Sequence, residues 1–420
     1  MTFPIDAVRA EFPALAVTDK GVSRVYFDAP GGTQTCRRAI AAMVRHLESG
    51  TANSGGDFIS SIDTDAVSHA AHQAMADLLG GHADEIAFGQ NMTSLTFSVS
   101  RALARGWDAG DELVLTRLDH DANVTPWVMA ARDRGMTVRW IDLDPERGTL
   151  RIDDLPALLG PKTRLVAVGG ASNALGTVND LTEIVRIVRA HSDALVFVDA
   201  VQFVPHLPTD VAAIGCDLLA CSPYKFFGPH QGVLWGRSDL LAALTAYKVR
   251  PASDTPPAHK FETGTPSFES QAGVLGTIDY LDWLGGQLLP DGDNGPADRR
   301  SRLIAAMRGC TAYERIIGQQ LIDGLAAVGA RLYGPPSMDG RVPTFAFTMP
   351  GHSPDETARR LARDNIFAWA GHFYALEPVA RLGLSESGGL VRVGLCHYST
   401  ADEVDRLIAS LAALGAKRAN

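Results

Sequence analysis

Short apolar runs alternate with helical stretches along the chain from about residue 85 to residue 236. The runs cover residues 85–88, 112–115, 137–141, 164–168, 195–198, 217–221 and 232–235. Helical spacing of apolar residues separates most of them, for example at residues 181–190. This alternation predicts an α/β fold with a mostly parallel, seven-stranded sheet and helices on both faces. Ligands of such sheets bind beyond the carboxyl ends of the strands, so the residues directly after each run are the candidates for function.

The alternation ends after Trp235, and the pattern that follows predicts a smaller α+β domain. Residues 248–270 are rich in Pro, Thr and Ser, which is typical of a long ordered loop. Further helices and strands are expected at residues 271–283, 298–327, 344–348, 390–393 and 401–414, with a loop at 285–294. The 420 residues therefore divide into an N-terminal segment (1–20), a large domain (21–275) and a small C-terminal domain (276–420).

Composition and charge exclude several classes of protein. The formal charge of −10 comes without a basic block, which argues against a nucleic-acid surface. No apolar run approaches the roughly 20 residues of a membrane helix. The five cysteines form no CxxC pair, and His69 and His72 have no evident third ligand, so we expect neither disulfides nor a metal. These features predict a cytoplasmic protein with reduced thiols.

An acid and a lysine follow two of the predicted strands. Asp199 directly follows the run at 195–198, and Lys225 comes shortly after the run at 217–221. Such a pair is often only a salt bridge. Pyridoxal phosphate (PLP) enzymes, however, need a lysine for covalent attachment, an acid for the ring nitrogen and donors for the phosphate. Asp199 and Lys225 fit the first two of these requirements.

Other strand ends carry polar residues that fit the same cofactor or have simpler explanations. Asn91 and Thr93 open a helix after the run at 85–88, and free N–H groups at a helix N-terminus bind phosphate. The same residues also form an ordinary helix cap. His120 follows the run at 112–115 and Asn173 the run at 164–168. A surface histidine and a turn asparagine are the alternatives for these two.

Six segments, in this order along the chain, resemble the class V aminotransferase family and, within it, the cysteine desulfurase and selenocysteine lyase branch. They span nearly the whole chain. The segments are residues 26–32, 119–127, 171–177, 198–202, 261–266 and 391–395.

The resemblance implies the PLP-dependent fold of type I and a role for each matching residue. Lys225 holds PLP as a Schiff base, Asp199 pairs with the ring nitrogen, and His120 stacks on the ring. Asn173 and Gln202 lie near the ring oxygen. Arg392 binds the substrate carboxylate, which suits a planar guanidinium. The implied phosphate ligands are Asn91, Met92, Thr93, Ser222 and, from the partner subunit of a homodimer, Thr265.

Two positions depart from the pattern of the desulfurases. Tyr224 stands where a histidine usually precedes the lysine. Tyr374 stands in the segment 369–374 where the desulfurases carry their catalytic cysteine. Without a mobile thiolate there is no acceptor for persulfide sulfur, and Cys221 and Cys396 are poor substitutes. We therefore do not expect persulfide chemistry.

The leading hypothesis for the reaction is β-elimination from a cysteine-like or S-conjugated amino acid. His372 and Tyr374 either contact the leaving group or pack the domain interface. Loss of the same Cα proton also serves an aminotransferase or an epimerase, and a PLP-free interaction scaffold is the non-enzymatic alternative. The chain lacks both the GxGxxG turn of nicotinamide dehydrogenases and the GxxxxGK[ST] loop of phosphate-binding nucleotidases.

Overall fold

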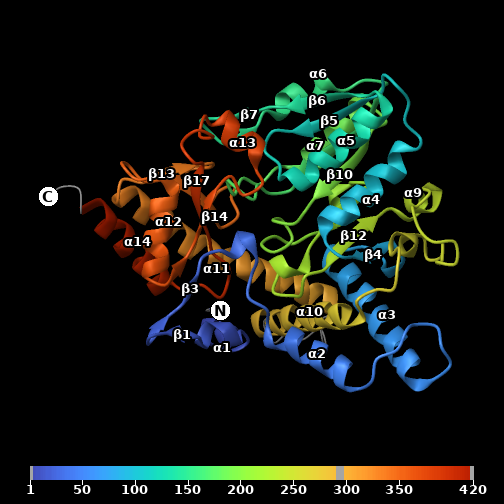
Figure 1. Cartoon of the computed structure of the whole chain (residues 1–420), viewed down its shortest axis with the longest axis horizontal. Coiled ribbons are helices and arrows are strands. Elements are labelled where there is room, and N and C mark those ends of the chain that lie inside the picture. Colours follow the sequence, from blue (N-terminus) through green and yellow to red (C-terminus); the bar gives the residue numbers. More distant parts are fainter. Residues whose placement is uncertain (1–2, 290–297, 417–420) are drawn as a thin grey trace.

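The computed structural model describes residues 3–289 and 298–416. A seven-stranded sheet lies in the right half of Figure 1. In spatial order the strands are β4 (Ile86–Gly89), β12 (Gly232–Gly236), β11 (Leu218–Cys221), β10 (Leu195–Asp199), β9 (Thr163–Gly169), β5 (Glu112–Thr116) and β6 (Thr137–Ile141). Strand β12 runs antiparallel to both of its neighbours, and the other pairs are parallel. The predicted mostly parallel sheet is confirmed.

Helices cover both faces of this sheet because side chains of its inner strands alternate between two apolar clusters. Phe197 and Leu218 point to the cluster that includes α4 (Met92–Ala104) and α5 (Thr125–Arg134). Val196, Val198 and Leu219 point to the opposite cluster, which includes α3 (Ile59–Leu79), α7 (Leu181–His191), α10 (Phe268–Leu288) and α11 (Arg299–Ala327).

A second sheet, with four antiparallel strands, lies at the left of Figure 1. Its strands are β13 (Arg331–Tyr333), β14 (Thr344–Thr348), β17 (Leu390–Gly394) and β16 (Trp369–Gly371), with α12 (Pro354–Arg363), α14 (Ala401–Ala416) and part of α11 packed against them. The predicted strands at 344–348 and 390–393 and the helices at 298–327 and 401–414 correspond to these elements. The division into domains at residues 20 and 275 remains a proposal.

The predicted loop at 285–294 begins too early. Helix α10 continues through Gly285 to Leu288, and residues 290–297 lie outside the described residues. The reason is packing: a Cβ at Gly285 would lie 1.9 Å from the backbone oxygen of Arg302 on α11. Glycine therefore permits the close crossing of the two helices, and it does not mark the end of α10.

The N-terminal segment contacts helices that pack on each of the two sheets. Arg9 of α1 (Ile5–Ala10) donates to Glu403 of α14, and Phe12, just after α1, packs on Phe227 and on Tyr280 of α10. None of the helices in the described residues has the length and hydropathy of a bilayer span. The remaining elements are α2 (Arg37–Glu48), α6 (Leu155–Leu158), α8 (Val211–Ile214), α9 (Ser238–Ala243), α13 (Leu376–Arg381), β1 (Thr18–Asp19), β2 (Val22–Ser23), β3 (Val25–Tyr26), β7 (Leu143–Asp144), β8 (Thr149–Leu150) and β15 (Ile366–Phe367).

Candidate active site

A cavity of about 1100 Å³ opens at the carboxyl ends of the parallel strands and extends to β16 and β17 of the second sheet. The predicted residues from both parts of the chain meet here, although up to about 300 positions separate them in the sequence. Thr265 does not line this cavity, and its side chain is exposed. The predicted residues that line the cavity are Asn91, Met92, Thr93, His120, Asn173, Asp199, Gln202, Ser222, Lys225, His372, Tyr374 and Arg392.

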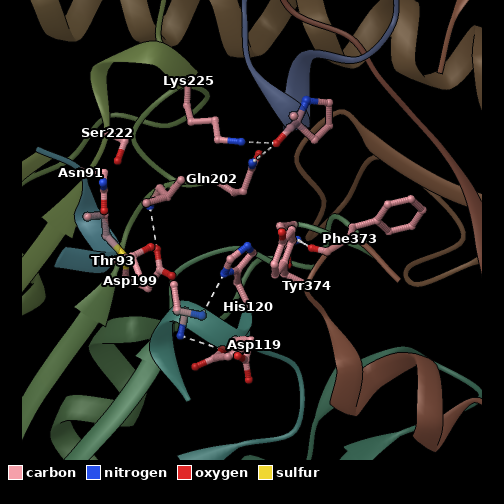
Figure 2. Close-up of a pocket in the computed structure, with 18 of the residues that line it drawn as sticks. Asn91, Thr93, Asp119, His120, Asp199, Gln202, Ser222, Lys225, Phe373 and Tyr374 are labelled. Atoms are coloured by element: carbon pink, nitrogen blue, oxygen red, sulfur yellow. Dashed lines mark hydrogen bonds between the residues drawn. The ribbon is translucent and has the colours of Figure 1, made fainter. Parts of the chain in front are cut away.

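Lys225 ends a short turn that follows β11, and its side chain is buried. Its Nζ and the Nε2 of Gln202 both donate to the carbonyl oxygen of Pro30 (Figure 2). Burial lowers the pKa of Lys225 to about 7, assisted by the positive charge of Arg392 and opposed by the negative charge of Asp199. Near neutral pH a large fraction of this amine is therefore unprotonated, as a nucleophile or a base requires.

Asp199 lies at the end of β10, and burial raises the pKa of its carboxyl to about 6. Its Oδ1 accepts a hydrogen bond from the N–H of Val201 at 3.0 Å. A buried carboxyl with a raised pKa is stabilised in its charged form by a cationic partner. The protonated ring nitrogen of PLP is such a partner, so Asp199 fits the predicted role.

His120 is a neutral, flat side chain at the wall of the cavity. Its Nδ1 accepts from the N–H of Ala122 at 3.0 Å, and burial lowers its pKa to about 4. The phenol ring of Tyr374 stacks on it, with 5.5 Å between ring centres and 24° between ring planes. An uncharged imidazole held by its own turn is suited to stacking on an aromatic cofactor.

The phosphate end of the predicted site is the N-terminus of α4. Asn91 caps this helix by accepting from the N–H of Ser94 at 2.9 Å. Gly232 of β12 lies so close that a Cβ there would be 2.4 Å from the backbone of Asn91. Ser222 precedes the lysine turn and is buried. Unpaired N–H groups of a first helical turn, together with a hydroxyl, fit a phosphate.

Arg392 and Asn173 leave buried polar atoms without a partner at the cavity. The Nη1 of Arg392 donates to the carbonyl oxygen of Asn173 at 2.9 Å, whereas its Nε is unpaired. The Oδ1 of Asn173 is also unpaired. Burial lowers the pKa of Arg392 to about 10, so its guanidinium stays charged at neutral pH. Both residues line the cavity, where a charged guanidinium and an amide fit the carboxylate and the hydroxyl of a ligand.

The loop that carries Tyr374 is fixed to the large sheet by its backbone. The N–H of Asp121 donates to the carbonyl of Tyr374 at 2.7 Å, and Asn173 donates to the carbonyl of Phe373 at 2.8 Å. Phe373 and Tyr374 have φ values of 55° and 57°, a strained conformation for non-glycine residues. The Tyr374 side chain is 67% exposed beside the cavity, so the phenol stays accessible although the backbone of the loop is held and the ring stacks on His120.

Tyr224, the other departure from the desulfurase pattern, also lines the cavity. Its ring stacks on His230, with 4.6 Å between ring centres. The Nζ of Lys225 lies 4.7 Å from the centre of the Tyr224 ring. Burial raises the pKa of the phenol, so Tyr224 packs beside the lysine as a neutral aromatic.

None of the five cysteines lines the cavity, and all five are buried. Burial raises the pKa of Cys36 to about 11 and of Cys216 to about 12, and it raises the pKa of the other three in the same direction. Reactive cysteines have a lowered pKa and are accessible. The described structure therefore offers no thiolate at this site.

Two contributors were not predicted from the sequence. The segment Ala29–Gly31 brings the Pro30 carbonyl to Lys225, and it lies so close to β17 that a Cβ at Gly394 would be 2.1 Å from the Pro30 ring. Asp119 accepts from the N–H of Gly169 and from Asn123, and burial raises its pKa to about 7. Pro30 and Asp119 both lie in segments that resemble the family, and nothing else in the sequence indicated their roles.

The family described as class-V aminotransferases matches residues 25–288 and 303–407. This chain belongs to that family. A cysteine desulfurase of Dickeya dadantii (strain 3937) is 32% identical over 429 aligned residues, with 97% of this chain and 96% of that protein covered. The aminotransferase-like protein FGM3 of Gibberella zeae is 31% identical, with 98% of each chain covered. The apo structure of cysteine desulfurase from Thermococcus onnurineus NA1 has a TM-score of 0.87 at 24% identity and covers 99% of both chains.

Membership of the class-V aminotransferase family confirms the predicted family and fold. It also confirms that the chain is an enzyme of a PLP-dependent family. The roles of the individual residues remain predictions, and the experiments below test them.

Uptake of PLP by cofactor-free protein should depend on pH through Lys225. The neutral amine reacts with the aldehyde, so the rate rises as pH increases through the lysine's lowered pKa of about 7. Between pH 6 and pH 8 we expect a rise of about tenfold, since the neutral fraction grows by that factor around a pKa of 7. Stopped-flow absorbance measures this rate. A rate that rises only above pH 9 would contradict the assignment, because it would indicate an ordinary exposed lysine.

Proposed function

We propose that this enzyme is a C–S lyase that removes the sulfur substituent from a cysteine-like or S-conjugated amino acid by β-elimination. The products are a thiol, pyruvate and ammonia. One observation carries the proposal. The cavity that contains Lys225, Asp199 and Arg392 is lined by the exposed Tyr374 and by no cysteine. Elimination needs no second nucleophile, whereas persulfide formation does.

Each of these cavity residues has a separate role in the proposed reaction. Arg392 lines the cavity and binds and orients the substrate carboxylate through its guanidinium, which fixes the Cα–H bond relative to Lys225. Neutral Lys225 accepts the Cα proton. Asp199 keeps the ring nitrogen protonated, and His120 holds the ring by stacking. When bound, PLP supplies the electron sink for the charge that develops at Cα.

Tyr374 and His372 are proposed to act on the leaving group. The phenol of Tyr374 is accessible at the cavity. The Nδ1 of His372 accepts from the N–H of Tyr374 at 3.1 Å, which leaves the Nε2 of His372 to interact with a ligand. A proton donor at this loop would neutralise the departing sulfur. Aliphatic thiolates gain most from such donation because they are basic.

We also propose a homodimer in which Thr265 of the partner subunit completes the phosphate site. In the isolated chain Thr265 is exposed and outside the cavity, and the exposed apolar side chains of Phe58, Ile59 and Ile62 lie at the start of α3. Because Thr265 is exposed in the isolated chain, Thr265→Ala should weaken PLP binding in the dimer without disturbing contacts within one subunit. Light scattering after gel filtration tests the dimer itself. The five free cysteines support a reducing compartment, the cytoplasm.

A substrate panel tests the reaction. Holoenzyme incubated with cysteine, selenocysteine and S-alkyl or S-aryl cysteine conjugates should release pyruvate and ammonia in equal amounts. Transfer of the amino group to an added keto acid, with no pyruvate from any panel member, would instead make the enzyme an aminotransferase. Racemisation without either product would make it an epimerase.

The Tyr374→Phe variant tests the leaving-group role. If the phenol donates a proton, kcat for an S-alkyl cysteine should fall by about 10²-fold, the lower range for general acid catalysis. An S-(nitrophenyl) conjugate should lose little, because its thiolate needs no proton to depart. Equal losses for the two substrates would show that Tyr374 only positions the loop.

A further inference from the structure

Three potential metal ligands gather outside the active site. His72 lies on α3, and His259 and Glu262 lie in and after the turn Pro257–Phe261. One ligand atom from each residue, two imidazole nitrogens and one carboxylate oxygen, lies within 4.8 Å of the others. They line a separate cavity of about 260 Å³ together with His69 and Asp84. The sequence showed no third ligand for His69 and His72 because His259 and Glu262 are almost 190 positions away.

The hydrogen bonds of His72 leave one ring nitrogen facing an acceptor. The Nδ1 of this buried imidazole lies 2.7 Å from the carbonyl oxygen of Ser68, so Nδ1 carries the hydrogen. The Nε2 lies 2.8 Å from Oε1 of Glu262. When the imidazole is protonated, these two atoms form a hydrogen-bonded ion pair, and a metal ion at the site would take the place of the Nε2 proton. A backbone carbonyl that holds the distal N–H is the usual support of a metal-bound histidine.

The other two ligands are also positioned for a shared ion. The Oε1 of Glu262 accepts from the N–H of Phe88 in β4 at 2.7 Å, which fixes the carboxylate. The His259 ring lies 4.6 Å from the His72 ring, centre to centre, and is tilted by 40°. Among the described residues no hydrogen-bond partner holds the His259 imidazole, so its nitrogens are available.

We propose that His72, His259 and Glu262 bind a divalent transition-metal ion of the zinc class. Two imidazoles and one carboxylate suit Zn²⁺ or Co²⁺, whereas Mg²⁺ and Ca²⁺ prefer oxygen ligands alone. The cavity leaves a fourth position for water or a further ligand. Asp84 adds negative charge beside the three ligands.

The metal ion joins three parts of the chain: α3 through His72, β4 through the Glu262 carboxylate, and the segment 257–266. Thr265 lies three residues after Glu262, so the ion anchors the segment that presents this threonine. Since the ion binds the folded arrangement and not the unfolded chain, it stabilises the protein by mass action.

Metal binding by untagged holoenzyme tests the proposal. After treatment with a chelator and its removal, addition of Zn²⁺ should leave one equivalent bound per chain, measured by plasma mass spectrometry. Co²⁺ should give the visible absorption bands of a four-coordinate site, at longer wavelength than the PLP band. Both signals should be lost in His259→Ala and Glu262→Gln, whereas His352→Ala, a histidine away from the cavity, should bind as the wild type does.

Two further readouts keep the test independent of folding. The PLP absorption of each variant reports its integrity, and X-ray absorption of the zinc-loaded wild type counts the imidazole ligands directly. Zn²⁺ should also raise the Tm of the wild type and not that of the ligand variants. No bound equivalent in the wild type, or equal binding by the wild type and both ligand variants, would overturn the proposal and leave His72 and Glu262 as an ion pair alone.

Discussion

The Lys225→Ala variant is expected to lose on the order of 10³-fold or more in kcat, because it lacks the base that accepts the Cα proton. It should also lose covalent attachment of PLP. Treatment with borohydride should fix the cofactor to the wild-type protein and leave it dialysable from the variant. Peptide mapping of the reduced wild type should place the label on Lys225, whose amine is buried in the cavity and has a pKa lowered to about 7.

A surface lysine provides the control for this experiment. Lys162→Ala removes an exposed amine outside the cavity and should leave both kcat and cofactor attachment unchanged. If Lys225→Ala still carried borohydride-fixed cofactor, or kept more than a tenth of wild-type kcat, Lys225 would not be the attachment site.

Arg392→Ala is expected to lower kcat/KM by on the order of 10²–10³-fold, which corresponds to the loss of a buried, charge-assisted contact with the substrate. The guanidinium belongs to a buried residue that lines the cavity, and it keeps its charge at neutral pH. Arg392→Lys should recover only part of the loss, because an ammonium group cannot make the two parallel hydrogen bonds.

A substrate without a carboxylate separates binding from a structural effect of this change. The wild type should prefer an S-conjugate of cysteine to the matching conjugate of cysteamine, and Arg392→Ala should abolish that preference. Added guanidinium should restore part of the activity toward the cysteine conjugate. An equal loss for both conjugates would show that Arg392 supports the fold through its bond to Asn173 and does not recognise the carboxylate.

The position of the site could be predicted from the sequence because strand ends of a parallel sheet share one edge. Asp199 ends β10, and Ser222 and Lys225 follow β11, which pairs in register with β10. Local pattern alone did not separate a cofactor site from a salt bridge or a helix cap. The order of six matching segments did so, and five of the six supply residues to the same cavity, whereas the segment 261–266 does not line it.

What local pattern could not predict depends on packing between distant segments. The Pro30 carbonyl reaches Lys225 only because Gly394 of β17 permits close approach. Helix α10 passes through Gly285 because α11 crosses there, although glycine in a polar stretch is typical of a loop. His259 and Glu262 meet His72 through the path of the segment after residue 248, which has no periodic pattern. In each case the determining contact joins residues far apart in the sequence.

The products of a single turnover with cysteine test the central claim most directly. We expect pyruvate, ammonia and free sulfide in equal amounts, with the mass of the protein unchanged, because no thiol lines the cavity. Alanine as the product, together with a protein whose mass has increased by one sulfur atom, would contradict the account, since it would require a persulfide on one of the buried cysteines.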